Sequence, residues 1–443
     1  MLLVGVENIL WLLVLIGIMI MFHELGHFWA ARYFDVKVET FSFGFGPRLF
    51  GFRRGDTDYR FSLILFGGYV KMAGEQIGDE HAGDPRSLLA KPRWQRLVIA
   101  FAGPFMNVVL AVGLLTGLYM VKYQKISDAD MQAIIGHVMP DSPAAKAGIQ
   151  DGDRIVKLGA QENPTWEDVG LKEVESAYQP MYLTIERNGK RFDTTVTPTL
   201  GERSGLGYAG WDERGEVQLG EITPHLPAEK AGLKKGDLLI AVNGQPIHSL
   251  FKFQEITQNS GGQPVEIDFE RNREKRHVSV RPVFAGIDGP ERWMIGVMPQ
   301  QKLNLIATRL SFPGAFRESV RQNAKGAMLI AQFLKGIVQR RMSAKNLTGP
   351  IGIAQLSGEA AREGPSAFVV LMSMVSLNLA IFNLLPIPIL DGGVILMLFV
   401  EMVMQRDLSL NVKEAVFKVG FVAIMVIVAF AIYNDISRIL PAG

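Results

Sequence analysis

Apolar residues form four long runs along the chain, two near its start and two near its end. The runs cover Leu2 to about Phe22, about Leu97 to Val121, about Ala367 past Leu398, and about Ala415 to Ile432. A helix needs about 20 mostly apolar residues to cross a bilayer, so each run is predicted to be a transmembrane helix. The first run lacks a basic start and a small-residue cleavage site, which favours a retained helix over a signal peptide. The pattern therefore predicts a polytopic α-helical membrane protein.

Lys and Arg gather in the two segments that join the runs within each pair. The segment from Arg32 to Arg96 is rich in them, and the short segment between the last two runs also carries them. Because basic residues near helix ends are enriched on the cytoplasmic side, both segments are expected there. Both termini and the middle region, about residues 122 to 365, are then expected on the outer side of the membrane.

The middle region contains one pattern twice. Ser142 to Asp153 overlays Leu226 to Asp237, an offset of 84 residues, and the same offset pairs residues 186–188 with 270–272. The register holds without gaps, which indicates a tandem duplication. Each copy reads as a short strand, a Pro-started helix ended by Gly, a Gly-Asp turn and further strands, so two small α+β domains are predicted.

The Pro-Ala-x-x-Ala-Gly run in both copies resembles the PDZ domains of bacterial proteases. The resemblance implies a groove that receives a peptide as an additional β-strand. The expected groove residues are Ile135, Gly136, Leu219, Gly220 and Ile222. The alternative, that both copies are structural spacers without a peptide ligand, stays open.

These patterns divide the chain into consecutive parts. Residues 1–121 hold the first two transmembrane helices and a β-rich segment at 41–72, residues 122–206 and 207–290 the PDZ-like copies, residues 291–365 an amphipathic connector, and residues 366–443 the last two transmembrane helices. Within the connector, Phe312 to Lys345 combines an apolar face with basic residues, which favours a helix in contact with lipid on the outer membrane surface. Packing against the PDZ-like copies is the alternative.

Net charge and cysteine content exclude several classes of function. The formal net charge is +2 and no Lys/Arg-rich block occurs, which argues against nucleic-acid binding. The chain has no cysteine, so disulfides, cysteine-ligated zinc and thiol catalysis are excluded.

Two histidines and a glutamate end the first apolar run, in His23-Glu24-Leu25-Gly26-His27. Residues four apart share a helix face, so His23 and His27 can bind one zinc ion. Glu24 lies close to them without being a ligand, and it can take a proton from a water molecule that the zinc ion activates. Ionisable groups are costly in a bilayer unless they are paired, which also favours a metal site. Interfacial histidines beside a glutamate that reaches toward water are the structural alternative.

A catalytic zinc ion takes three protein ligands, and Asp391 is the candidate for the third. The remaining histidines fall in polar segments, whereas Asp391 interrupts an apolar stretch, in Asn383-Leu-Leu-Pro-Ile-Pro-Ile-Leu-Asp391. Pro386 and Pro388 are expected to break the helix just before it. Irregular backbone at membrane depth occurs where it is buried in protein or lines a wet cavity, and a carboxylate there is a functional candidate.

The two metal-site motifs together resemble the site-2 protease family of intramembrane zinc metalloproteases. The PDZ-like copies between the second and third spans make the chain similar to the bacterial RseP-type branch, the regulators of sigma-E. The resemblance covers essentially the whole chain and includes Gly44-Phe-Gly46-Pro47, Gly67-Gly68-Tyr69, Gly103-Pro104-x-x-Asn107 and Thr348-Gly-Pro-Ile-Gly352.

The resemblance implies roles for individual residues. The two histidines of the motif and Asp391 are implied as zinc ligands, with Glu24 as the general base. Asn383 and Asn378 are implied to hold the substrate or its oxyanion, which agrees with the need of buried amides for hydrogen-bond partners. Hydrogen bonding between neighbouring helices is the structural alternative for both asparagines.

The segment from Phe41 to Met72 alternates Phe, Tyr and Gly with other apolar residues, a pattern typical of β-hairpins. The resemblance implies a membrane-re-entrant β-element here. A transmembrane helix must unwind before it is hydrolysed, so an edge strand near the zinc ion is expected to hold it extended. Gly67, Gly68 and Tyr69 are the expected substrate-binding residues of this element.

The function expected is that of an intramembrane zinc endopeptidase in the bacterial inner membrane, with its active site toward the cytoplasm. The resemblance implies a single-span membrane protein as the substrate, either an anti-sigma factor already shortened by another protease or a remnant signal peptide. The PDZ-like copies are then expected to act as a size filter. A membrane-anchored zinc quality-control protease and a non-catalytic PDZ membrane scaffold stay open as alternatives.

Overall fold

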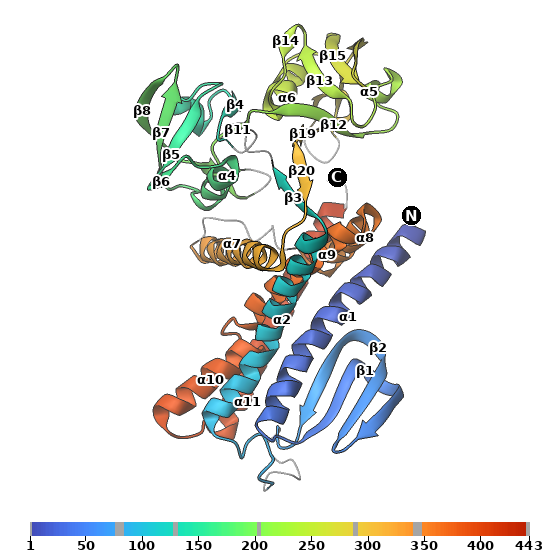
Figure 1. The fold of residues 1–443 in the computed structure, drawn as a ribbon, viewed down its shortest axis with the longest axis vertical. Helices are drawn as coiled ribbons and strands as arrows, with labels where there is room; N and C mark the ends of the chain where they lie inside the picture. The colour runs from blue at the N-terminus through green and yellow to red at the C-terminus, as the bar shows by residue number, and fades with distance from the viewer. Residues whose placement is uncertain are drawn as a thin grey trace. The chain divides into compact units, whose positions relative to one another are not determined.

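A computed structural model describes residues 2–75, 84–126, 132–201, 205–286, 291–339 and 348–439 (Figure 1). The chain forms two compact units. The first comprises Met1–Tyr123, Arg309–Ala331 and Leu347–Ile439, and the second comprises Gln124–Thr308, Gln332–Asn346 and Leu440–Gly443. Both metal-site motifs belong to the first unit.

Helices make up most of the first unit. They are α1 (Leu2–Tyr33), α2 (Arg93–Val121), α7 (Phe312–Val338), α8 (Pro350–Glu363), α9 (Pro365–Asn383), α10 (Asp391–Met404) and α11 (Leu410–Ile439). Among the described residues, four helices are long and apolar enough to cross a membrane, namely α1, α2, α9 and α11. The prediction of a helical membrane protein with a β-element is confirmed at this level. Residues 340–345 of the predicted amphipathic stretch lie outside the described residues.

The third apolar run forms two helices, not one. α9 ends at Asn383 and α10 begins at Asp391. Pro386 and Pro388 in the intervening segment have no backbone N–H and cannot continue a helix. Ile389 has a φ of 90°, which is a strained backbone conformation for a β-branched residue. The break separates α10 from α9, and α10 packs against α2.

Small and polar residues hold α1, α2 and α9 together. The hydroxyls of Ser373 and Ser376 on α9 donate to the carbonyl oxygens of Ala111 and Asn107 on α2, at 3.0 and 2.9 Å. Helices in a bilayer associate through such packing and hydrogen bonds, because lipid supplies no hydrophobic drive between them. The apolar core of this bundle contains Leu15, Met19, Leu110, Phe368, Leu371 and Met372.

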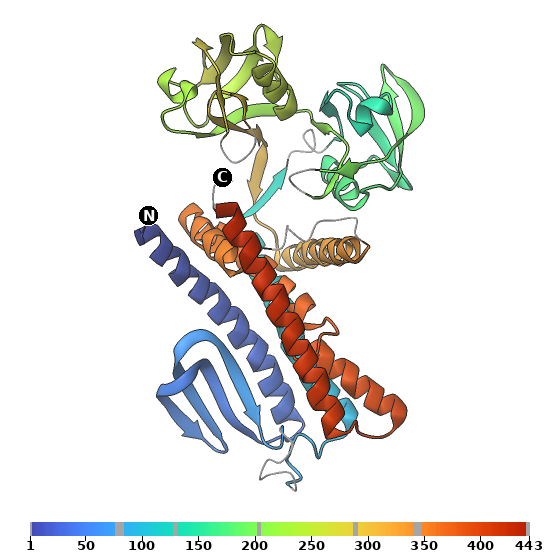
Figure 2. The same ribbon diagram turned by 180° about the vertical axis from the view of Figure 1, so that it is seen from behind.

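A β-sheet built from two long strands lies beside α1 (Figures 1 and 2). These strands are β1 (Val38–Arg54) and β2 (Thr57–Met72). The first half of β1 pairs with both ends of β2, whereas its second half pairs with the start of β2 alone. The sheet therefore has four rows, in the order 68–72, 38–45, 57–64 and 48–54. Residues 68–72 form one edge of the sheet.

Two β-rich lobes make up most of the second unit, and each has its own hydrophobic core. The first lobe contains β4 (Ile135–Val138), α3 (Pro143–Lys146), β5 (Arg154–Leu158), β6 (Gln161–Glu162), α4 (Trp166–Glu175), β7 (Met181–Arg187), β8 (Lys190–Val196), β9 (Thr199–Leu200), β10 (Gly207–Tyr208) and β11 (Trp211–Glu213). The second contains β12 (Glu216–Ile222), α5 (Pro227–Lys230), β13 (Leu238–Val242), β14 (Gln245–Pro246), α6 (Leu250–Gln258), β15 (Val265–Arg271), β16 (Glu274–Val280), β17 (Val283–Ala285), β18 (Arg292–Met294) and β19 (Val297–Lys302). Outside the lobes, β3 (Tyr123–Ile126) pairs with β20 (Leu305–Thr308).

Each lobe contains a buried ion pair at the same place in its fold. Arg187 contacts both carboxylate oxygens of Asp153 at 2.6 and 2.7 Å, and Arg271 contacts both of Asp237 at 2.7 Å. Both aspartates are 1% exposed. A paired arginine keeps a buried carboxylate from being left uncompensated, so each pair fixes the end of its sheet.

The sheet order differs from the groove expected in these lobes. In the second lobe, β12 lies between β13 and β19, and Leu219 is fully buried. In the first lobe, β4 pairs with β11 on one side, while Ile135 on β4 bonds to the backbone of Asp153 on the other. A peptide can add only to a strand with a free edge. The predicted strands β4 and β12 are bonded on both sides, and β11 and β19 are their neighbours on the side away from β5 and β13.

Candidate metal centre

Three side chains from α1 and α10 converge within the first unit. The Nε2 atoms of His23 and His27 lie 3.2 Å apart, one turn apart on α1. Asp391, the first residue of α10, places Oδ2 at 3.1 Å from His23 Nε2 and Oδ1 at 3.5 Å from His27 Nε2. Among the described residues, they are the group of histidines and carboxylates that could hold a metal ion, with donor atoms within 4.8 Å of one another. Two imidazoles and one carboxylate form a donor set that suits catalytic zinc and leaves a coordination position open.

Two glycines allow Asp391 to reach the histidines. A Cβ on Gly392 would overlap the carbonyl oxygen of Leu385, and a Cβ on Gly393 would overlap that of Ile387. The irregular segment after α9 therefore folds directly against the first turn of α10. A carboxylate in the first turn also lies at the positive end of the helix dipole, which favours its charged form.

Two further glycines bring α1 and α2 into backbone contact at the site. A Cβ on Gly26 would overlap the carbonyl oxygen of Ala102. A Cβ on Gly103 would overlap the His27 ring at Nε2 and lie 2.9 Å from His23 Cε1. Small residues are the usual means of close helix approach in membranes. α2 thus forms the back wall of the metal centre.

The second nitrogen of each imidazole has a partner on α2. Nδ1 of His27 donates to the carbonyl oxygen of Ile99 at 2.8 Å. Nδ1 of His23 lies 3.1 Å from Nδ2 of Asn107, which is fully buried. Such outer contacts orient imidazole ligands toward a metal.

A cavity of about 1050 Å³ opens at these side chains. Glu24 lies on its wall, with its carboxylate against the backbone of Val70 in the edge row of the β-sheet. Tyr69 and Asn383 also line this cavity. The metal centre, a candidate base and a sheet edge therefore share one space.

An ion cluster lines another part of the same cavity. Glu401 on α10 is 1% exposed and contacts Arg96 on α2 at 2.8 Å and Lys413 on α11 at 2.6 Å. The backbone N–H of Leu408 also donates to Glu401 at 3.0 Å. Three partners compensate the buried carboxylate, so the cluster joins α2, α10 and α11 beside the metal centre.

The profile of peptidase family M50 matches residues 11–427 of this chain. The chain belongs to peptidase family M50, the site-2 protease family. The Regulator of sigma-E protease RseP of Salmonella typhimurium is 30% identical over 462 residues, covering 98% of this chain and 100% of that protein. A Neisseria meningitidis protein that carries the provisional name of a zinc metalloprotease is 30% identical over 440 residues. The match covers 96% of this chain and 97% of the Neisseria protein. This M50 peptidase is accordingly a zinc metalloprotease, and the donor set from α1 and α10 fits that metal.

The other predicted site residues of the M50 peptidase lie at different distances from the metal centre. A Cβ on Gly68 would overlap the carbonyl oxygen of Ser42 and lie 3.6 Å from the Glu24 side chain, so this part of β2 lies against the candidate base. Gly67 has a φ of 129°, and a Cβ there would overlap the Phe45 ring, so it shapes the sheet. Asn378 is half-buried in the middle of α9 and is not among the residues that line the cavity.

Sequence reasoning missed Asn107 and the Glu401 cluster as parts of the site. Both carried a signal, because a polar residue within an apolar run needs a partner. In the sequence, Asn107 stands out only as part of the motif Gly103-Pro104-x-x-Asn107. The partners of these residues come from other helices, so the sequence order alone does not identify them.

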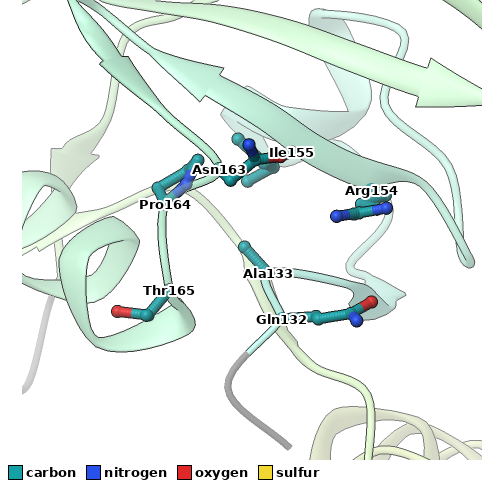
Figure 3. Close-up of a pocket in the computed structure, with 7 residues that line it drawn as sticks. All are labelled: Gln132, Ala133, Arg154, Ile155, Asn163, Pro164 and Thr165. Carbon is teal, nitrogen blue, oxygen red and sulfur yellow. The ribbon is translucent and has the colours of Figure 1, made fainter. Parts of the chain in front are cut away.

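A second cavity, of about 240 Å³, lies in the first lobe (Figure 3). Its lining residues are Gln132, Ala133, Arg154, Ile155, Asn163, Pro164 and Thr165. Arg154 is the one charged residue among them, so this cavity offers neither a metal donor set nor a paired nucleophile and base.

Replacing Gly103 with alanine tests whether α2 fixes the histidines. The new methyl group would displace the His27 ring, which is held by Ile99 and Asp391 and cannot move without losing a contact. We expect the zinc affinity of Gly103→Ala to fall by at least about tenfold, as measured by chelator competition on purified protein.

The matched control is Gly113→Ala on the same helix, where a Cβ meets nothing within 4 Å. It should bind zinc as the wild type does. Unchanged zinc affinity in a folded Gly103→Ala protein would show that contact with α2 does not fix the positions of the histidine rings.

Proposed function

We propose that this zinc metalloprotease hydrolyses single-span membrane proteins within or near their transmembrane segments. One observation carries the proposal: the metal centre and Glu24 line one cavity formed with α1, α2 and α10, and α1 and α2 are of membrane-spanning length. A substrate within the bilayer is the class that can reach such a site directly. Hydrolysis there also needs a wet cavity, which the charged lining near Glu401 supports.

The residues of the cavity divide the chemistry among them. His23, His27 and Asp391 would hold the zinc ion, which when bound would polarise a peptide carbonyl and activate a water molecule. Glu24 takes the proton from the attacking water and passes it to the leaving amine. The amide of Asn383 donates to the carbonyl oxygen as negative charge develops on it.

The edge row of the β-sheet would hold the substrate extended. Residues 68–72 pair with β1 on one side, and Tyr69, Val70, Lys71 and Met72 line the cavity on the other. The backbone N–H groups of Val70 and Met72 bond to Glu24 and Glu75, away from β1. An unwound substrate segment would take the place of these two carboxylates at the edge and present its carbonyl groups to the metal centre.

The distribution of basic residues sets the proposed orientation. Lys and Arg are enriched between α1 and α2 and also occur from Arg406 into the start of α11, which favours the cytoplasmic side for both connections. Both termini and the two lobes then lie on the periplasmic side of a bacterial inner membrane. His23 stands near the end of α1 that leads into the cytoplasmic connection, so cleavage occurs toward that side.

The two lobes act as PDZ-type size filters in this proposal. A peptide would add beside β11 and β19, which pair with β4 and β12 on one side. A membrane protein with a large outer domain is excluded, whereas one already shortened by another protease is admitted. Because relatives are named regulators of sigma-E protease, a shortened anti-sigma factor is the first substrate to test, followed by remnant signal peptides.

Glu24→Gln tests the proposed base. The substitution keeps the shape of the side chain and removes its ability to accept a proton. We expect zinc to stay bound and cleavage to fall by at least about 100-fold. The measurement is cleavage of two co-expressed single-span proteins that differ only in the presence of a folded outer domain, with products identified by mass spectrometry.

Glu7→Gln at the opposite end of α1 is the control and should cleave as the wild type does. The wild type should cut the shortened substrate and spare the full-length one. Continued cleavage by a zinc-loaded Glu24→Gln protein contradicts the assignment of Glu24 as the base. Equal cleavage of both substrates by the wild type refutes only the size-filter role of the lobes and leaves the catalytic assignment intact.

The edge-strand role can be tested by cross-linking, because the chain has no cysteine of its own. Tyr69→Cys in the Glu24→Gln background should form a disulfide with a single cysteine near the scissile bond of the substrate. Phe52→Cys, in the opposite edge row of the same sheet, is the control and should not. Equal cross-linking at both positions would mean that the substrate does not pair with residues 68–72.

A further inference from the structure

The outer partners of the two histidines differ in chemistry. His27 Nδ1 donates to the backbone carbonyl of Ile99, a group that only accepts hydrogen bonds. This contact places the proton of the neutral ring on Nδ1 and leaves Nε2 free to face Asp391. His27 is therefore already in the tautomer that a metal ion requires.

His23 faces a side-chain amide instead. Asn107 Nδ2 lies 3.1 Å from His23 Nδ1, while Asn107 Oδ1 is buried without a hydrogen-bond partner. With the amide in this orientation, Nδ1 accepts a hydrogen bond and the proton of the neutral ring belongs on Nε2, which lies 3.1 Å from Asp391 Oδ2. That tautomer does not suit metal binding, because the metal-facing nitrogen is occupied.

We propose that Asn107 is a positioning residue for His23, whose side-chain amide reverses so that Oδ1 accepts the Nδ1–H of His23 and frees Nε2 for the metal. The inference rests on the proposed ligand role of His23. A half-turn about the Cβ–Cγ bond exchanges Oδ1 and Nδ2 at nearly the same positions. The amide thus matches either tautomer, whereas the Ile99 carbonyl matches one.

The backbone around Asn107 is arranged to hold the side chain in place. Its own carbonyl oxygen accepts a hydrogen bond from Ser376 on α9 at 2.9 Å, and the residue is 0% exposed. Gly103, one turn earlier, lets α1 lie against α2, which brings the His23 ring to the amide. An amide also adds no net charge in an apolar region, where a carboxylate at the same position would be costly unless paired.

The test is the zinc affinity of Asn107 variants, measured by chelator competition on the purified full-length protein. Asn107→Leu is nearly isosteric and cannot accept a hydrogen bond, so its zinc affinity should fall by about 10–100-fold. Asn107→Asp can accept from Nδ1–H and should stay within about threefold of the wild type. Asn107→Asp therefore keeps the hydrogen-bond acceptor that Asn107→Leu removes. If Asn107 acted through packing alone, the two variants would not differ in this way.

Two controls identify the path of the effect. Thr116→Val replaces another buried polar residue of α2, whose hydroxyl bonds to the carbonyl of Val112, and should leave the zinc affinity unchanged. In a His23→Ala background, Asn107→Leu should have no further effect, because its influence passes through His23. If Asn107→Leu does not fold, Asn107→Ala, which leaves space but no acceptor, provides the same comparison.

Wild-type affinity in a folded Asn107→Leu or Asn107→Ala protein overturns the inference, as does an equal loss in Asn107→Asp. An effect of Asn107→Leu that persists in the His23→Ala background also overturns it. If His23→Ala itself keeps full zinc affinity, the proposed metal centre fails as well, and the two failures are thereby distinguished.

Discussion

The need to satisfy polar groups inside an apolar bundle governs the whole first unit. A charged or polar group in hydrocarbon is costly unless another group or a metal ion compensates it. Among the described residues, such groups lie around His23 and around Glu401, for example, and in both cases the partners come from different helices. The same requirement that stabilises these groups joins α1 to α10, and α10 to α2 and α11. The catalytic geometry is thus a consequence of how the helices must pack.

Backbone approach makes that compensation possible. Gly26 and Gly103 allow α1 and α2 to touch, and Gly392 and Gly393 allow the segment after α9 to fold onto α10. The proline-containing break before Asp391 then starts a helix at the metal centre itself. The β-sheet adds an edge row, residues 68–72, that pairs with β1 on one side and lies close to Glu24 on the other. In the proposed function, a helical substrate that unwinds would bind along this row, beside the metal centre.

The sequence predicted the features that depend on local pattern or residue chemistry. Apolar length identified the spans, histidine spacing identified one face of α1, and a carboxylate in an apolar run identified Asp391. The sequence did not predict features that depend on how strands and helices are arranged in space. The strands expected at the PDZ groove, β4 and β12, pair with β11 and β19, which come later in the chain. The role of Asn107 depends on which face of α2 meets α1, and the four rows of the β-sheet depend on where two long strands bend.

The central claim, that His23, His27 and Asp391 together hold the zinc ion, can be measured directly by zinc K-edge X-ray absorption on the purified protein. The account predicts one zinc ion per chain, with two imidazole nitrogens and a carboxylate oxygen at about 2.0–2.2 Å. It also predicts that Asp391→Ala loses the carboxylate ligand and most of the zinc. A spectrum with other than two imidazoles, or one unchanged in Asp391→Ala, would contradict it.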